Sequence, residues 1–125
     1  MKKDLSFSKE EKLKSRKMIG EIFEKGHVVK AYPVRIQFLF HNNAEFPPCQ
    51  TGVSVSKRKF KRAVDRNRIK RQLREAYRLN KSNFIDQLEK KEKRIALMII
   101  FTASKAIDYH DIEKAVKTSL SKIRI

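Results

Sequence analysis

Seven consecutive apolar residues, Ile95 to Phe101, constrain the fold more than any other segment of this chain. The run is far shorter than the roughly twenty residues that a membrane-spanning helix requires, and its length suits a strand. Because both of its faces are apolar, the strand is expected to lie inside a sheet that is covered on both sides. This segment therefore predicts an α/β protein in which helices pack on a central strand.

The surrounding pattern supplies the other elements of one domain. Apolar residues alternate with other residues from Val34 to Phe40, which is the period of a strand with one buried face. A second strand is expected over 50–56 and, because a loop rich in Asn and Pro separates the two, the spacing suggests an antiparallel pair. Helices are expected at about 15–25, at about 61–80, as a turn over 82–88 before a charged loop at 89–94, and after Asp108.

Gly26 is expected to end the first helix, because glycine accepts a left-handed backbone without strain. The element order predicts a single domain over residues 1–125. Its first fourteen residues are polar and basic, so residues 1–14 are expected to form a flexible N-terminal arm.

Composition narrows the class of partner. Among 125 residues there are 31 Lys and Arg against 14 Asp and Glu, a formal net charge of +17, while 40% apolar residues and eight Phe indicate a folded core. Nucleic acid is the first partner that such a basic domain suggests, and an anionic membrane is the second. The start of the chain has no apolar signal segment, and the lone Cys49 fits a reducing cytoplasm.

The positive charge is concentrated between Lys57 and Arg78. These 22 residues hold eleven Lys or Arg and two acids, which gives +9 of the net +17. In a helix, one stripe is apolar and the opposite stripe carries a linear basic track, made of Asn67, Arg71, Arg74 and Arg78. Guanidinium groups grip phosphate oxygens in pairs. An ordinary solvated helix face is the alternative, but the acids that normally balance such a face are missing here.

Residues suited to catalysis are sparse. His27, His41 and His110 have no Cys or His at metal-ligand spacing, and the Asp108–Asp111 pair suits helix capping. With three glycines there is no phosphate-binding loop, and no nucleophile lies beside a base. The residues predict a nucleic-acid-binding module with no catalytic or metal site of its own.

The central motif resembles that of a known family. Residues 61–71 read Lys-Arg-Ala-Val-Asp-Arg-Asn-Arg-Ile-Lys-Arg, preceded by Thr-Gly-Val-Ser-Val-Ser-Lys at 51–57 and followed by Leu-Arg-Glu-Ala at 73–76. In this pattern the chain resembles the protein subunit of bacterial ribonuclease P. The resemblance covers most of the chain, from the opening at 13–26 to the last strand and helix at 95–123.

The resemblance implies a ribosomal-protein-like two-layer sandwich, in which a mixed sheet packs with helices and a left-handed βαβ crossover breaks the usual right-handed rule. It implies two RNA partners, the catalytic RNA subunit and precursor tRNA, and the removal of the 5′ leader from the latter. Catalysis is expected from that RNA and from Mg²⁺ held mainly by it. The protein itself is expected to be a cytoplasmic monomer that binds no membrane.

The resemblance also implies which residues contact RNA. It gives Arg58, Arg66, Asn67, Arg68, Lys70, Arg71 and Arg74, and the charge of the same segment adds Lys57, Arg62 and Arg78 to the expected RNA-binding set. A cleft for the leader, between the first helix and the sheet, is expected to be lined by Ile19, Phe23, Arg35 and Gln37. Ile19 and Gln37 stand where the family pattern has aromatics, although a one-residue slip brings Phe38 to the second position. The segment 58–64 is one residue longer than expected.

Three other functions fit the residues. A ribosomal or RNA-chaperone protein binds RNA without processing it. A DNA-binding protein places the basic helix in the major groove of a duplex. A nuclease with protein-borne catalysis cleaves RNA by itself.

Overall fold

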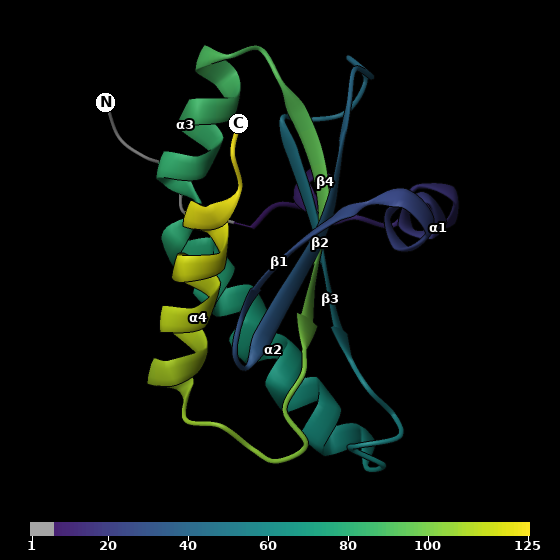
Figure 1. Cartoon of the computed structure of the whole chain (residues 1–125). Coiled ribbons are helices and arrows are strands. Elements are labelled where there is room, and N and C mark those ends of the chain that lie inside the picture. Colours follow the sequence, from purple (N-terminus) through teal and green to yellow (C-terminus); the bar gives the residue numbers. More distant parts are fainter. Residues whose placement is uncertain (1–6) are drawn as a thin grey trace.

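One four-stranded sheet organises the chain, as the computed structural model of residues 7–125 shows (Figure 1). Its strands are β1 (His27–Ala31), β2 (Val34–His41), β3 (Cys49–Val55) and β4 (Arg94–Phe101). The spatial order is β1-β2-β4-β3, and β4 is antiparallel to β2 and parallel to β3. The apolar run therefore forms an internal strand, as predicted, and Ile95, Leu97 and Ile99 are fully buried.

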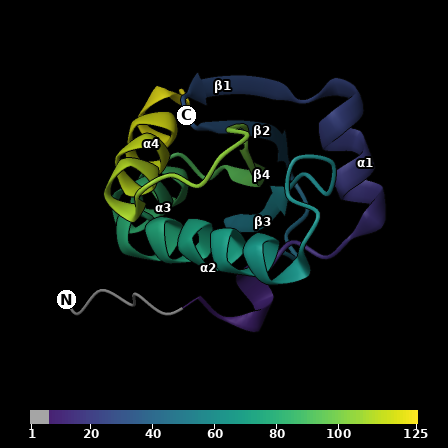
Figure 2. The same ribbon diagram turned by 90° about the horizontal axis from the view of Figure 1, so that it is seen from below.

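Helices pack on both faces of this sheet, as Figures 1 and 2 show. One face carries α2 (Ala63–Asn80), α3 (Ser82–Lys90) and α4 (Tyr109–Lys122), and the other carries α1 (Arg16–Lys25). The sheet and the three-helix layer make the predicted two-layer sandwich, whereas α1 covers part of the opposite face, which is called the open face below. A short 3-10 helix, η1 (Lys9–Glu11), lies against β3.

The connection from β3 through α2 and α3 to β4 joins two parallel neighbours in the sheet. In Figure 1 both strands run downwards and the helices lie to their left, and Figure 2 gives the order of the strands in depth. The crossover is left-handed, as the family resemblance implied. Its helical part places the basic segment beside the outer strand β3.

Two features of the sheet differ from the sequence-based expectation. The predicted antiparallel pairing of the strands at 34–40 and 50–56 is wrong, because β4 inserts between β2 and β3 and pairs with both. The strand β1 was not predicted. Only Val29 and Ala31 of β1 pack on the core, while Val28 and Lys30 are exposed, so its hydrophobic alternation is weak. The segment from residue 82 is also a nine-residue helix instead of a single turn.

Two hydrophobic clusters lie on opposite faces of the sheet. The larger lies under the three-helix layer and includes the inward side chains of β2 and β4. The smaller lies under α1, and its buried members are Leu13, Ile22, Ala96 and Met98. Because α1 is only ten residues long, it covers one end of the open face. The next row of that face, Val28–Gln37–Met98–Gly52, is only partly covered, since Met98 is buried under α1 whereas Val28 is 44% exposed.

Gly26 ends α1, as predicted, but for a different reason. Its backbone is extended, with φ −76° and ψ 163°, so no left-handed conformation is needed. A Cβ at this position would lie 2.4 Å from the carbonyl oxygen of Ile22 and 2.8 Å from that of Phe38. Only glycine lets the chain pass this close to the helix end and to β2.

The segment before α1 also differs from the expected free arm. The Leu13 N–H donates to the Thr51 carbonyl at 3.0 Å, and Leu13 is buried. The Gln50 side chain donates to the Glu10 carbonyl at 3.1 Å. Residues 8–13 are therefore docked along β3, and the part of the predicted arm at 1–6 lies outside the described residues.

Candidate nucleic-acid interface

The basic segment folds as α2 because its apolar residues recur on one side. Ile69, Leu73, Ala76 and Tyr77 are at most 1% exposed, and the helix packs through them on β3 and α4. The opposite side is exposed at Asn67, Arg71 and Arg74. The predicted separation of a buried stripe and a basic track is confirmed as geometry, while RNA contact stays a prediction.

Three arginines of this surface, Arg68, Arg71 and Arg74, have no acidic partner within residues 7–125, and all three are exposed. Lys70 lies at the edge of the track and is half-buried. Exposed guanidinium groups that no carboxylate neutralises are available for phosphate oxygens. We call Arg68, Arg71 and Arg74 together with Asn67 the α2 ridge.

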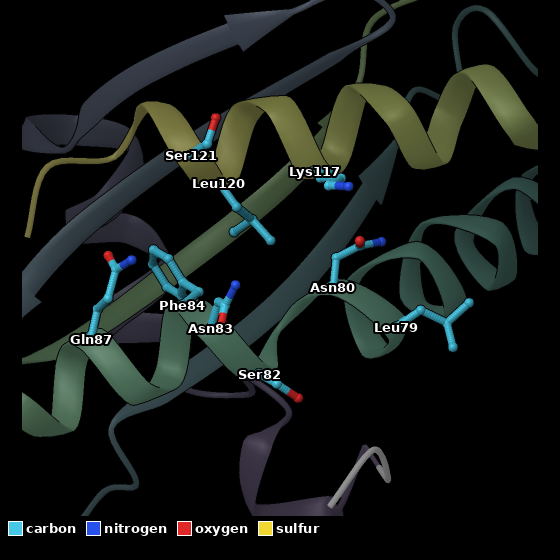
Figure 3. A pocket seen from close by; sticks show the side chains of 9 residues that line it. All are labelled: Leu79, Asn80, Ser82, Asn83, Phe84, Gln87, Lys117, Leu120 and Ser121. Carbon is cyan, nitrogen blue, oxygen red and sulfur yellow. The ribbon is translucent and has the colours of Figure 1, made fainter. Parts of the chain in front are cut away.

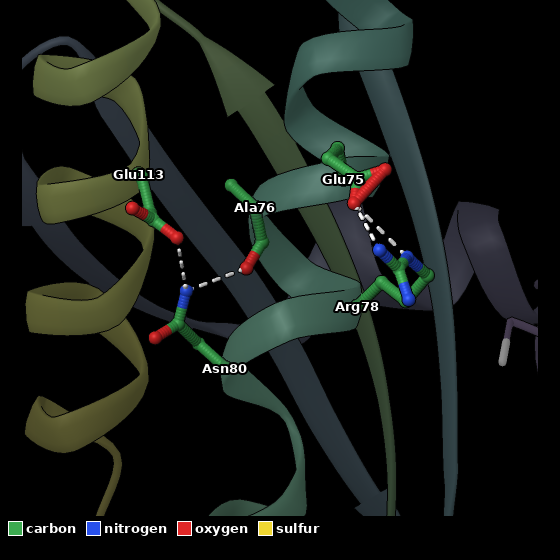
Figure 4. A network of polar contacts seen from close by, with 5 residues as sticks. All are labelled: Glu75, Ala76, Arg78, Asn80 and Glu113. Carbon is green, nitrogen blue, oxygen red and sulfur yellow. Dashed lines mark hydrogen bonds and ion pairs between the residues drawn. The ribbon is translucent and has the colours of Figure 1, made fainter. Parts of the chain in front are cut away.

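Other members of the predicted set have partners inside the protein. Arg66 Nη1 donates to the carbonyls of Phe60 and Lys61, at 2.8 and 2.9 Å, and so ties down the loop before α2. Arg62 Nε lies 3.4 Å from Asp65 Oδ2. Figure 4 shows Arg78 held by Glu75 of the preceding turn. These three arginines are thus partly engaged in holding α2 and its approach.

The loop between β3 and α2 presents Lys57 and Arg58, which are both exposed. The Ser56 hydroxyl accepts the N–H groups of Arg58 and Lys59 at 3.2 and 3.3 Å, which forms a tight turn. Lys59 Nζ donates to the Thr102 carbonyl at 2.8 Å. The turn fixes where the two exposed cations lie relative to the start of α2.

The four predicted cleft residues lie on α1 and β2. Phe23 is 47% exposed on α1, and Ile19 packs beside the smaller cluster. Gln37 lies on the open face in register with Met98, whereas Phe38 is buried under the three-helix layer. The slip that brings Phe38 to the cleft is therefore excluded, and Phe23 is the exposed aromatic of the predicted set.

Arg35 lies two residues before Gln37 on the open face and is half-buried. Its Nε is shielded from solvent and donates to no acceptor within residues 7–125.

Two basic residues near the site, Lys12 and Lys14, were not in the predicted set. Both are exposed, and with Arg74 they line a groove of about 260 Å³ beside β3. The signal in the sequence is the alternation Lys12–Leu13–Lys14, which an extended segment with one buried residue produces. Its polar and basic composition instead predicts a flexible arm, because the single apolar residue Leu13 gives only a weak signal.

A separate cavity of about 520 Å³ lies between the α2–α3 junction and α4. Figure 3 shows Phe84 and Leu120 on its wall together with the amides of Asn80, Asn83 and Gln87. Of the residues that line it, Lys117 alone is charged. The cavity shares no residue with the predicted RNA-binding set and lies away from the α2 ridge.

The reactive side chains of the core are held in unreactive forms. Burial raises the pKa of the Cys49 thiol to about 11, and the Tyr77 hydroxyl donates to its sulfur at 3.2 Å. Burial also raises the pKa of Tyr77 well above its ordinary value. The pKa of His41 is lowered by burial and by the charge of Arg94. These groups are neutral near pH 7 and suit packing better than nucleophilic attack.

Within the described part of the chain, no group of three or more His, Cys, Asp or Glu residues could hold a metal ion. The same residues include no helix of the length and apolarity that crossing a membrane requires.

Comparison with known proteins decides the family. Residues 7–124 match the ribonuclease P family. The chain belongs to this family. The ribonuclease P protein component of Porphyromonas gingivalis W83 is 34% identical over 116 residues, which cover 93% of this chain and 85% of the relative. The ribonuclease P protein component of Clostridium botulinum Langeland is 35% identical over 117 residues, which cover 94% of this chain and 97% of the relative.

Solved structures of ribonuclease P proteins agree with the fold. The Staphylococcus aureus protein superimposes with a TM-score of 0.69 at 26% identity, over 89% of this chain and 93% of that one. The Thermotoga maritima protein, at 21% identity, has the same fold. Its TM-score is 0.67, over 91% of this chain and 98% of that one. Membership of this family implies a function in processing the 5′ end of tRNA together with an RNA subunit.

Proposed function

We propose that the chain assists removal of the 5′ leader from precursor tRNA by binding two RNA molecules, and that the bond is cut by the RNA subunit. The α2 ridge carries the proposal, because it is a row of exposed arginines that no carboxylate within residues 7–125 neutralises. A row of this kind on a helix follows a ribose-phosphate chain better than it encloses a small molecule. Family membership supplies the identity of the RNA partners.

The catalytic RNA is assigned to the α2 ridge together with Lys57 and Arg58. The precursor's leader is assigned to the open face beside α1, where Phe23 offers an exposed ring for stacking on a base. Gln37 and the guanidinium of the half-buried Arg35 offer hydrogen bonds to the same RNA strand. Neutralising phosphates on both surfaces lowers the repulsion between the two RNAs, so the assembly needs less Mg²⁺ to form.

The reaction itself is assigned to the RNA and to Mg²⁺ bound by it. This proposal assigns no step to a metal held by the protein. Within residues 7–125, no group of three or more His, Cys, Asp or Glu residues could hold a metal ion. The protein neutralises charge and positions the substrate. We also propose that it works in the cytoplasm and is a monomer before assembly, which sedimentation of the isolated protein would test.

One reconstitution separates this function from its alternatives. The protein is mixed with the catalytic RNA and labelled precursor tRNA at an Mg²⁺ concentration at which the RNA alone is slow. We expect the protein to accelerate release of the intact leader. No acceleration would contradict the proposal and favour an RNA chaperone. Cleavage by the protein without the RNA would indicate a protein-borne nuclease. Tighter binding to duplex DNA than to either RNA would favour the DNA-binding alternative.

A further inference from the structure

One groove joins the two surfaces that the proposed function treats separately. Its wall contains Arg74, which belongs to the α2 ridge, and Ile19, which belongs to the predicted leader cleft. Gly52 and Met98 from neighbouring strands also line it. Because α1 and α2 lie on opposite faces of the sheet (Figure 2), the groove passes around the outer edge of β3 from one face to the other.

Three cations line this groove, and they come from two separate parts of the chain. Lys12 and Lys14 flank the buried Leu13, and Arg74 reaches the groove from α2. All three are exposed, and within residues 7–125 none of them is paired with a carboxylate. None of the residues that line the groove is acidic. The groove therefore concentrates positive charge where an anion can approach.

The segment that carries the two lysines is held in place by buried contacts. The side chain of Lys81 is 2% exposed, and its Nζ lies 2.5 Å from Glu11 Oε2. The ring of Phe7 packs against Tyr77, with 5.5 Å between centroids, and Lys81 Nζ lies 5.9 Å from its centre. Together with the backbone bond from Leu13 to Thr51, these contacts set the groove before any ligand arrives. Such preorganisation lowers the cost of binding.

We propose that the groove binds the phosphates of a single-stranded RNA segment that crosses the β3 edge between the open face and the α2 ridge. This inference rests on the proposed function and adds a route for the RNA. The three cations bind the phosphates. Ile19 and Met98 present apolar surface to the ribose or base. At about 260 Å³ the groove is smaller than most small-molecule sites, and an open passage of that size suits a chain that continues at both ends.

The test removes the three cations together. The variant is Lys12→Gln/Lys14→Gln/Arg74→Gln, and its control is Lys90→Gln/Lys105→Gln/Lys114→Gln, which loses the same charge at exposed sites outside the groove. Two affinities are measured across a salt series, that of the assembled complex for precursor tRNA and that of the protein for the catalytic RNA. Mature tRNA without a leader serves as a reference ligand. Thermal unfolding checks that both variants are folded.

We expect the groove variant to bind one of these RNAs at least about tenfold more weakly than the control does. The slope of log affinity against log salt should fall in magnitude by about two, at about 0.7 per phosphate of a single strand. If the loss is confined to precursors that carry a leader, the leader occupies the groove. If it is confined to the catalytic RNA, that RNA does. Equal affinities of groove variant and control in both assays would overturn the proposal.

The double variant Lys12→Gln/Lys14→Gln keeps the α2 ridge intact and is expected to show part of the same loss. If the unsubstituted protein fails to accelerate leader removal, the proposed function is wrong whatever the groove variants do. If it succeeds and both groove variants match their control, the groove alone is wrong.

Discussion

Arg66 and Arg71 lie on the same helix and within one sequence motif, yet their surroundings differ. The guanidinium of Arg66 donates to two backbone carbonyls of the preceding loop. Arg71 is exposed and has no carboxylate partner within the described chain. A basic motif thus combines residues that shape the protein with residues left over for RNA, and sequence alone does not distinguish them.

Substituting each of these two arginines should separate the roles. Arg71→Ala is expected to leave the free energy of unfolding within about 0.5 kcal/mol of its original value, since exposed side chains contribute little. It should weaken RNA binding and reduce the salt slope by about one. Arg66→Ala should lower the free energy of unfolding by about 2 kcal/mol, because two carbonyls lose a charged donor. Urea unfolding measures the free energy of unfolding of each variant, and RNA titration measures its affinity for RNA. A larger stability loss in Arg71→Ala would contradict the assignment.

Cys49 gives the second prediction at this scale. Its pKa rises from about 9.0 in the unfolded chain to about 11 in the fold, because burial disfavours the thiolate. Above pH 9 the unfolded chain loses this proton while the folded protein keeps it, so stability must fall between pH 9 and pH 11. The loss is expected to approach about 3 kcal/mol, at 1.36 kcal/mol per unit. Denaturant unfolding measures the free energy of unfolding of the protein and of Cys49→Ala, and the difference between the two should change with pH. A difference that stays constant from pH 9 to pH 11 would contradict the prediction.

At the scale of elements, one ion pair is among the contacts that hold the N-terminal segment in place. Glu11 is the carboxylate partner of Lys81, a lysine with almost no exposure. Glu11→Gln removes the charge of this partner of the buried ammonium, which should cost about 3 kcal/mol, the lower part of the range for a broken buried pair. Glu10→Gln, one residue away and exposed, is the matched control and should change little. Chemical unfolding measures both, and similar values would show that the pair does not hold the segment.

Two glycines, one inside α1 and one at its C-terminal end, provide a second matched test. Gly20 lies within the helix and has no atom within 4 Å of an added Cβ, so Gly20→Ala should stabilise the protein by up to about 1 kcal/mol. At Gly26 the same methyl meets the carbonyl oxygen of Ile22 at 2.4 Å, so Gly26→Ala should destabilise it. Thermal unfolding gives the sign of each change. A stabilising Gly26→Ala would show that the chain can move away from the helix end.

Sequence patterns predicted those elements whose side chains have a single dominant environment. The apolar run of β4 and the two-sided pattern of α2 belong to this group. Sequence patterns failed to predict those elements whose position or pairing is decided by tertiary contacts. β1 is half-exposed and carries a weak alternation, and the partners of β2 and β3 depend on β4, which follows some forty residues after β3. The docked segment at 8–13 is polar, and what anchors it is a lysine about seventy residues away in the sequence.

The candidate site divides in the same way. The periodicity of α2 predicted which of its arginines face away from the core. It did not show that Arg66 reaches back to the loop, because that bond depends on the backbone path before the helix. The family resemblance predicts Gln37 for the leader cleft, and the structure places it on the open face in register with Met98. The groove at Lys12, Lys14 and Arg74 joins segments that the sequence keeps sixty residues apart.

At the scale of the whole molecule, the net charge of +17 works against the compact state. Like charges lie close together on the α2 ridge and around the groove, and within the described residues the ion pairs that could offset them are few. An anion that binds only the folded protein relieves this repulsion and shifts the equilibrium toward the fold. The free protein is therefore expected to be less stable than its core implies, and RNA to stabilise it.

Sulfate provides a simple test of that coupling. Thermal unfolding is followed in sodium sulfate and in sodium chloride at the same ionic strength, so that general screening of charge is equal. At one hundred times its dissociation constant, a bound anion adds about 2.7 kcal/mol to the free energy of unfolding. Because sulfate also strengthens burial by exclusion from the surface, Arg71→Ala/Arg74→Ala serves as the control. The sulfate-specific rise in melting temperature should shrink in this variant if the ridge binds the anion. An unchanged rise would mean that sulfate acts through solvent alone and that the α2 ridge is not an anion site.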